Sequence, residues 1–289
     1  MITAILGLLT AVTYGAADFF AAIATRKIRV VEVTALASLS GLIVLTILLP
    51  LMGGIFSQDA FFWGLMGGLS SVVALLCLYA SLALGPISII SPLGALVSAI
   101  VPAVIGVSFL GESFTVLGWA AIAIALVAVV LVGFVPGDNV TLPKPRAIVL
   151  AIGAGIGIGI AVSSLARSPH DSGIAPIIIM RTTAALLLGA VVLFIALRQK
   201  KSSTDSTRTP ITPKDLLTIM GAGALDAGAN IFFTLASRSG SLTVVGVLTA
   251  LYPLGTILLA RIVLKEHVAT TQKIGIALTL TASLLLALA

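Results

Sequence analysis

Charged residues are scarce in this chain of 289 residues. Asp, Glu, Lys and Arg together make up 9% of it, whereas hydrophobic residues make up 59%. Because soluble globular domains carry about 25% charged residues, this composition excludes an ordinary soluble domain. Apolar runs of about 20 residues recur between short polar breaks, which predicts a multi-pass membrane protein made of helices rather than of barrel strands.

Cysteine and the common catalytic motifs are nearly absent. The single Cys77 excludes an intramolecular disulfide and a cysteine-based metal cluster. The two histidines, His170 and His267, lie in predicted turns and form no metal set with a cysteine. No Ser/His/Asp arrangement can be assembled at one membrane depth, and no GxGxxG pattern follows a strand. We therefore expect no enzyme, no metal site and no cofactor.

Lys and Arg are also missing from residues 1–12, and the apolar run that starts there continues to about Thr25. A cleavable signal peptide has a basic start and a shorter apolar run. The first segment is therefore expected to be a retained membrane span.

The apolar runs predict an all-α membrane protein of about ten transmembrane helices. Most of the breaks between them are short, which is typical of antiparallel neighbours. The predicted helices cover residues 3–24, 32–52, 60–84, 88–109, 115–135, 147–167, 174–197, 215–237, 242–264 and 270–288.

Basic residues gather in the breaks on one side of this helical array. Thirteen of the 16 Lys and Arg residues belong to that side, among them Arg26, Lys144, Arg198 and Lys265. Because loops rich in Lys and Arg stay in the cytoplasm, we expect a protein of the inner or plasma membrane with both termini outside the cytoplasm. The same distribution explains the net charge of +6 without a nucleic-acid partner.

The two halves of the chain resemble each other. Residues 66–88 can be laid on residues 221–243, which pairs Gly68 with Gly223. This predicts two repeats, residues 1–136 and 147–289, joined by a cytoplasmic linker at 137–146. Because five helices is an odd number, the second repeat must be inverted relative to the first, and such repeats place a substrate site near the midplane.

Two stretches carry a resemblance to a known family. They are SPLGALVSAIVPAVIGVSFLGESFTVLGW and LTALYPLGTILLARIVLKEHVATTQKIGIAL. They resemble the fourth-to-fifth and ninth-to-tenth helix signatures of the EamA branch of the drug/metabolite transporter superfamily. The resemblance implies a secondary transporter in the lipid bilayer that exports a small metabolite, such as an amino-acid-like solute, by alternating access. An ion-independent facilitator or exchanger, and a non-transporting scaffold or lipid-handling protein, are the alternatives.

An acidic residue in the eighth predicted helix requires either a functional role or a partner that compensates its charge. An Asp at the centre of a membrane helix costs about 2.5–3.5 kcal/mol and usually faces a bundle interior or a watery cavity. Asp226 stands there, and Asn230 lies one turn further on the same face. Arg181 in the seventh helix could pair with Asp226, snorkel outward to head groups, or grip an anionic substrate group.

A second acidic residue, Asp18, lies in the first helix, one turn after Tyr14. Asp18 could line a cytoplasmic vestibule, bond within the helix bundle, or pair with Arg26. Proton movement through Asp226 or Asp18 is the hypothesis for what drives transport.

The remaining candidate residues are hydroxyl-bearing side chains and prolines. Ser71 is the repeat counterpart of Asp226, and Tyr79 and Tyr252 offer rings and hydroxyls to a solute, although simple packing would account for them equally well. Prolines remove backbone hydrogen bonds, so those in the fourth and ninth helices are candidate kinks and gating points. They are Pro92, Pro102 and Pro253.

Two further patterns predict helix contacts. Glu112 and Glu266 occupy matching turns, and each is expected to favour the N-terminus of the helix that follows it. Gly153, Gly155, Gly157 and Gly159 form small-xxx-small pairs, which permit close approach of neighbouring helices.

Overall fold

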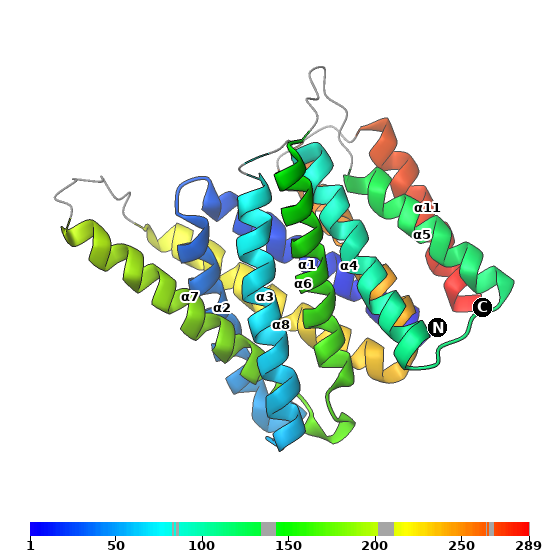
Figure 1. Ribbon diagram of the computed structural model, residues 1–289, viewed down its shortest axis with the longest axis horizontal. Helices are drawn as coiled ribbons and strands as arrows, with labels where there is room; N and C mark the ends of the chain where they lie inside the picture. The colour runs from blue at the N-terminus through cyan, green and yellow to red at the C-terminus, as the bar shows by residue number, and fades with distance from the viewer. Residues whose placement is uncertain are drawn as a thin grey trace.

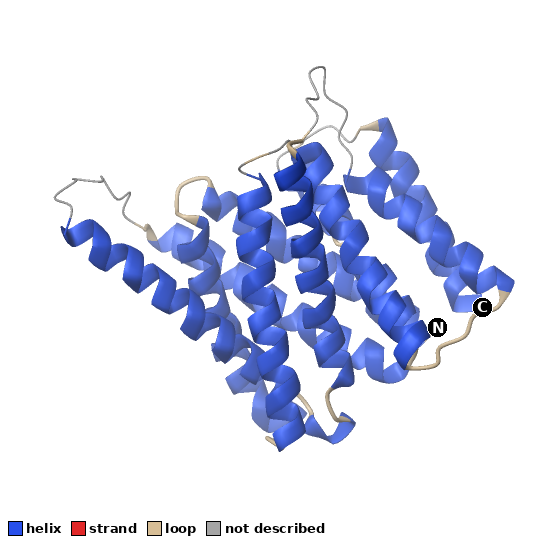
Figure 2. Ribbon diagram, in the orientation of Figure 1, coloured by secondary structure: helices blue, strands red, loops and turns tan. Residues whose placement is uncertain are grey.

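The computed structural model describes residues 1–82, 84, 87–133, 143–201, 211–263, 265 and 269–288. Within these residues every regular element is a helix (Figure 2). The helices are α1 (Ile2–Thr25), α2 (Val30–Met52), α3 (Gln58–Leu82), α4 (Ile87–Phe109), α5 (Val116–Gly133), α6 (Pro145–Arg167), α7 (Ala175–Lys201), α8 (Pro213–Ser239), α9 (Leu242–Thr249), α10 (Pro253–Val263) and α11 (Thr270–Leu288), with a short 3-10 turn at His170–Ser172. Glu266 and residues 137–142 of the expected linker lie outside the described residues.

The prediction of one continuous ninth helix is wrong. α9 ends at Thr249 and α10 begins at Pro253. Proline has no amide hydrogen and cannot extend the hydrogen-bond ladder of a preceding helix. The intervening residues instead form tight turns, in which the Tyr252 amide donates to the Thr249 carbonyl at 3.0 Å. Pro92 and Pro102, by contrast, lie inside α4, which runs through both without a break.

The outer surface of the bundle is apolar. Eight segments of the described residues are long and apolar enough to cross a membrane, and α9 and α10 together form one of them, while α5 contributes a shorter apolar helix. Large side chains that are more than half exposed include Ile43, Ile47, Val149, Leu186 and Leu284. Such a surface is stable against lipid, where helices satisfy their own backbone groups.

Helices pack mainly on helices of the other half of the chain. α1 packs on α8, α3 on α6, α2 on α7 and α8, and α5 on α11. The α5–α11 pair forms one edge of the bundle, and α2 and α7 lie towards the other (Figure 1). The core therefore lies between the two halves of the sequence rather than within either half.

Glycines permit the closest of these contacts. A methyl group at Gly155 of α6 would lie 2.6 Å from the Gly94 carbonyl oxygen of α4, and one at Gly157 would lie 2.8 Å from Ala74 of α3. The expectation that the glycines of this helix allow close approach is confirmed. Similarly, Gly15 of α1 lets the backbone of Tyr252 approach α1 directly.

The bundle has two ends of different character. At the basic face, where α1, α7 and α10 end and α2, α6 and α8 begin, Lys27 forms an exposed ion pair with Asp215 at 3.2 Å. At the opposite face, the Arg238 guanidinium donates to the carbonyl oxygens of Pro169 and Gly173 at 3.1 and 3.0 Å. These opposite-face bonds tie the end of α8 to the turn between α6 and α7.

Candidate functional site

A cavity of about 310 Å³ lies in the middle of the bundle. Side chains from α1, α2, α3 and α4 line it together with side chains from α6, α7, α8 and α9 and from the turn before α10. Both halves of the chain thus build one cavity, of a size suited to a small molecule.

Most of the sequence-predicted site residues meet at this cavity. Seven of them line it: Tyr14, Asp18, Ser71, Arg181, Asp226, Asn230 and Tyr252. The eighth, Tyr79, belongs to α3, but its side chain lies outside what the structure describes. The structure therefore brings together residues from segments that are far apart in the sequence.

Arg181 and Asp226 form an ion pair across α7 and α8. Their side chains are 13% and 27% exposed, so neither reaches far into solvent. Of the three roles open to Arg181, the structure shows pairing with Asp226 rather than snorkelling to head groups. Two opposite charges in contact spare each other most of the cost of separate burial.

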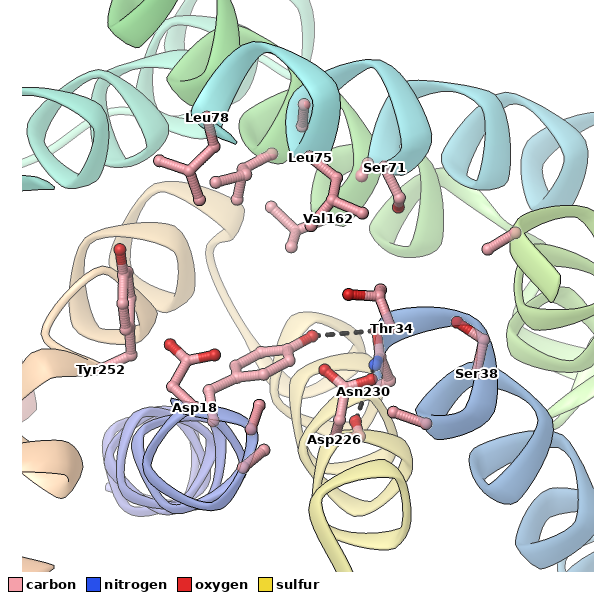
Figure 3. Close-up of a pocket in the computed structure, with 18 of the residues that line it drawn as sticks. Asp18, Thr34, Ser38, Ser71, Leu75, Leu78, Val162, Asp226, Asn230 and Tyr252 are labelled. Atoms are coloured by element: carbon pink, nitrogen blue, oxygen red, sulfur yellow. Dashed lines mark hydrogen bonds between the residues drawn. The ribbon is translucent and has the colours of Figure 1, made fainter. Parts of the chain in front are cut away.

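Tyr14 and Asn230 extend this polar network. The Tyr14 hydroxyl donates to Asn230 Oδ1 at 2.9 Å, and Asn230 Nδ2 donates to the backbone carbonyl of Asp226 at 2.7 Å (Figure 3). Asn230 is fully buried, so these bonds satisfy an amide that would otherwise be costly to bury. The network fixes Tyr14 of α1 against α8.

Asp18 stands apart from the network. Its side chain points into the cavity beside Tyr252 (Figure 3). Among the described residues it forms no ion pair and no hydrogen bond, so the expected alternative of pairing with Arg26 is wrong. Of the described residues that line the cavity, those of charged type are Asp18, Arg181 and Asp226, so Asp18 is the carboxyl group without a cationic partner there.

The charged residues and the large apolar side chains labelled in Figure 3 lie on different sides of the cavity, with Ser71 of α3 beside the apolar ones. Asp18, Tyr252, Asp226 and Asn230 lie along one side, and Leu75, Leu78 and Val162 face them from α3 and α6 (Figure 3). A solute that fills this space meets a charged group at one end and hydrocarbon at the other.

The comparison with known families bears on this arrangement. The sequence profile of the EamA-like transporter family matches residues 1–134 and residues 145–288, which is nearly the whole chain. The chain belongs to the EamA-like transporter family. It is therefore a multi-pass membrane transporter of the drug/metabolite type, with a small molecule as its substrate and lipid as its surroundings.

A solved structure supports the fold of this EamA-like protein. It is described only as "Crystal structure of protein", and it matches with a TM-score of 0.77 at 16% identity, over 99% of this chain and 96% of that one. At this identity the match shows the same fold and nothing about the solute. No curated protein matches the sequence significantly.

In this family member, Glu112 does not act on the helix that follows it, so that expectation is wrong. Its carboxylate instead accepts hydrogen bonds from the Ser241 hydroxyl at 2.7 Å and from the amides of Leu242 and Thr243 at 2.6 and 3.0 Å. Glu112 thus caps the N-terminus of α9, which belongs to the other half. The positive end of a helix favours a carboxylate at this position.

Four polar lining residues were not predicted from the sequence. They are Thr34 and Ser38 of α2, Ser98 of α4 and Thr249 of α9. Thr34 and Ser38 are spaced four residues apart and so share one face of an otherwise apolar helix, which is a signal that the sequence does contain. Ser98 and Thr249 stand singly, and small hydroxyl residues are common in packed membrane helices, so no such signal marks them.

Proposed function

We propose that this protein is a secondary transporter that exports a small metabolite by alternating access of two inverted five-helix repeats with ten membrane spans. The observation that carries the proposal is the central cavity, because both halves of the chain line it and its polar groups lie deep within the bundle. A site between two repeats, near the midplane, can be exposed to either side when one repeat rocks against the other.

The packing of the helices supports the inverted relation. If α1 to α3 correspond to α6 to α8, the contact of α1 with α8 has its counterpart in the contact of α3 with α6. Gly68 of α3 packs on Thr183 of α7, and its counterpart Gly223 of α8 packs on Ala37 of α2. Exchanging the halves therefore preserves these contacts, as a twofold axis would require. In addition, α1 ends at the basic face while its counterpart α6 begins there, as expected when this axis lies in the membrane plane (Figure 1).

The opposite face is the closed side in this proposal. There Thr3 donates to the Ser239 carbonyl at 3.0 Å, Glu112 caps α9, and nearly every residue of α9 is buried. Towards the basic face, described cavity-lining residues come within four positions of three helix ends, at Ala21 of α1, Val33 of α2 and Leu78 of α3. Towards the opposite face, only Gly246 of the buried α9 does so among the described residues. The basic face is then the cytoplasmic side, and the cavity opens towards it.

Proton coupling is assigned to Asp18 rather than to Asp226 in this proposal. Asp226 already has the Arg181 guanidinium as its partner, whereas Asp18 faces the cavity and has no such partner in the described part of the chain. Among the described residues, the titratable or charged groups that line the cavity with Asp18 are Tyr14 on its own helix, Tyr252 before α10, and the Arg181–Asp226 pair further along the cavity. A carboxylate that is accessible to cavity water can gain and lose a proton as the cavity changes sides.

The test is metabolite release followed by flux. Metabolites that accumulate outside cells producing the protein, but not outside cells producing Asp18→Asn, are candidate solutes. Purified protein in liposomes should then accumulate such a solute in response to an imposed pH gradient, and Asp18→Asn should lose this response. Flux that does not depend on the pH gradient would indicate an ion-independent facilitator. Equal release by both cell lines and no flux would contradict the transport proposal.

A further inference from the structure

We propose that the solute is an amphipathic organic cation, held by Asp18 between the rings of Tyr14 and Tyr252. This inference rests on the proposed transport function and names the substrate class of the same cavity. The evidence is the charge balance of the cavity, the aromatic groups beside Asp18, and the apolar wall opposite.

The charge balance favours a cation. Arg181 and Asp226 neutralise each other, so Asp18 is the remaining ionisable carboxyl group among the described residues that line the cavity. Asp18 has no ion-pair or hydrogen-bond partner in the part of the chain that the structure describes. A carboxylate at membrane depth that lacks a partner is costly, and a cationic ligand removes that cost by pairing with it.

The flanking rings favour an organic ammonium over a small hydrated ion. Tyr14 lies one helical turn from Asp18 and therefore on the same face of α1. Tyr252 comes to the same place because Gly15 lets its backbone approach α1, where Thr256 also donates to the Gly15 carbonyl at 3.0 Å. Aromatic faces beside a carboxylate attract ammonium groups through cation–π interaction.

The apolar side chains opposite Asp18 favour a solute with a hydrocarbon body. Leu75, Leu78 and Val162 face Asp18 and Tyr252 across the cavity (Figure 3). Apolar side chains here suit the hydrocarbon body of the solute, while its ammonium group meets the carboxylate. An anionic solute would find its complementary cation, Arg181, already occupied by Asp226.

The experiment compares three probes with the same phenyl body and different charge. They are phenylethylammonium as the cation, phenylalanine as the zwitterion and 3-phenylpropionate as the anion. Equilibrium binding to the purified full-length protein in lipid nanodiscs is measured for each probe, and counterflow uptake is measured in liposomes. We expect the cation to bind at least about tenfold more tightly than the other two.

Variants link the preference to Asp18. Asp18→Asn should weaken binding of the cation by about tenfold or more, and Asp18→Glu should restore part of it because the charge returns. Tyr252→Leu should weaken it further than Tyr252→Phe, which keeps the ring. Asp59→Asn makes the same chemical change in the first turn of α3, outside the cavity, and should bind like the unchanged protein.

The two readouts separate the two proposals. Binding of the cation without uptake would support the cation site and contradict the transport function. Three results would overturn the cation site: tighter binding of the zwitterion or the anion, undiminished binding of the cation by Asp18→Asn, or no binding of the cation at millimolar concentration. Uptake of the zwitterion or the anion would in that case still support the transport function.

Discussion

The ion pair of Arg181 and Asp226 is the most tightly coupled pair of charges in the cavity. Two helices of the same half, α7 and α8, carry these residues but pack little on each other, so the pair bridges a gap across the cavity. Removing one partner leaves the other charge without compensation, and this costs more than removing both.

A double-mutant cycle tests the pair. Arg181→Ala and Asp226→Ala should each lower the unfolding temperature in detergent, and the double variant should lose less than the sum of the two. The coupling expected for such a pair is about 1–3 kcal/mol. The exposed pair of Lys27 and Asp215, with the Lys27 side chain 61% exposed, serves as control and should show a smaller coupling. Additive losses at Arg181 and Asp226 would contradict the pairing.

At the residue scale the sequence identified the polar side chains and offered Arg181 as one possible partner of Asp226, but it did not predict the bond from Tyr14 to Asn230. Tyr14, Asp18, Asp226 and Asn230 could be selected because polar groups in apolar helices need a partner or a use. Their pairing depends on how α1 and α8 are rotated towards each other, which is decided by contacts between distant segments. For this reason the sequence could not tell that Asp226 has a charged partner whereas Asp18 has none among the described residues.

At the scale of single elements, the break between α9 and α10 shapes the cavity. It turns the chain at residues 250–252, which places Tyr252 at the cavity and leaves α9 a helix of eight residues. So short a helix needs its ends satisfied, and the carboxylate of Glu112 supplies the N-terminal acceptor.

Glu112→Gln tests this cap. The change keeps the shape but removes the charge that faces two backbone amides and a hydroxyl, so we expect a loss of about 1–3 kcal/mol in stability, measured by thermal unfolding in detergent. Glu32→Gln, in the first turn of α2, is the matched control, because no hydrogen bond or ion pair joins Glu32 to the described residues. Equal stability of Glu112→Gln and the unchanged protein would show that the cap contributes nothing.

Gly15 of α1 lies in close backbone contact with Tyr252 and Gly255, at the start of α10. A methyl group there would lie 2.7 Å from the Gly255 Cα and would also collide with the Tyr252 carbonyl, so Gly15→Ala should destabilise the protein by about 1–3 kcal/mol. Gly189→Ala, where nothing lies within 4 Å, should instead be neutral or stabilising by about 0.5–1 kcal/mol. Thermal unfolding of both variants checks the difference, and the same shift in both would contradict the contact.

Helix positions were predictable because an uncharged apolar run of about 20 residues has the length of a membrane-spanning helix and is too long for a single strand. The sequence marked Pro253 as a candidate kink, but it could not single out the break there, since Pro92 and Pro102 stand in an equally apolar helix that stays continuous. Whether a proline ends a helix depends on neighbours that can satisfy the freed backbone groups. The cap by Glu112 was not predictable for a similar reason, because the helix that it caps lies in the other half of the chain.

At the scale of the whole molecule, the fold consists of two halves that hold a cavity between them. Contacts across the halves outweigh those within each half, so neither half is expected to be stable alone. The resemblance of the two signature stretches predicted a helical membrane protein of two repeats, and the family match covers both of them. The solute was not predictable in this way, since the cavity depends on side chains brought together from many helices.

The orientation in the membrane can be tested at the termini. We expect both ends to lie outside the cytoplasm, because the basic residues gather at the other end of the bundle. An alkaline phosphatase fused to either terminus should be active, and a green fluorescent protein at the same positions should be dark. Fluorescence at both termini would reverse the assignment of the two faces without changing the fold.

The central claim is that the cavity communicates with one side of the membrane at a time. Its most direct test is a single cysteine at Ser71, in a protein whose Cys77 is replaced by serine, treated with a membrane-impermeant thiol reagent from either side. Ser71→Cys should react from the basic face, and Glu112→Gln should add reaction from the opposite face by weakening the cap on α9. Leu186→Cys, on the lipid-facing surface, should react from neither. Failure of Ser71→Cys to react from either side would contradict a transport pathway through this cavity.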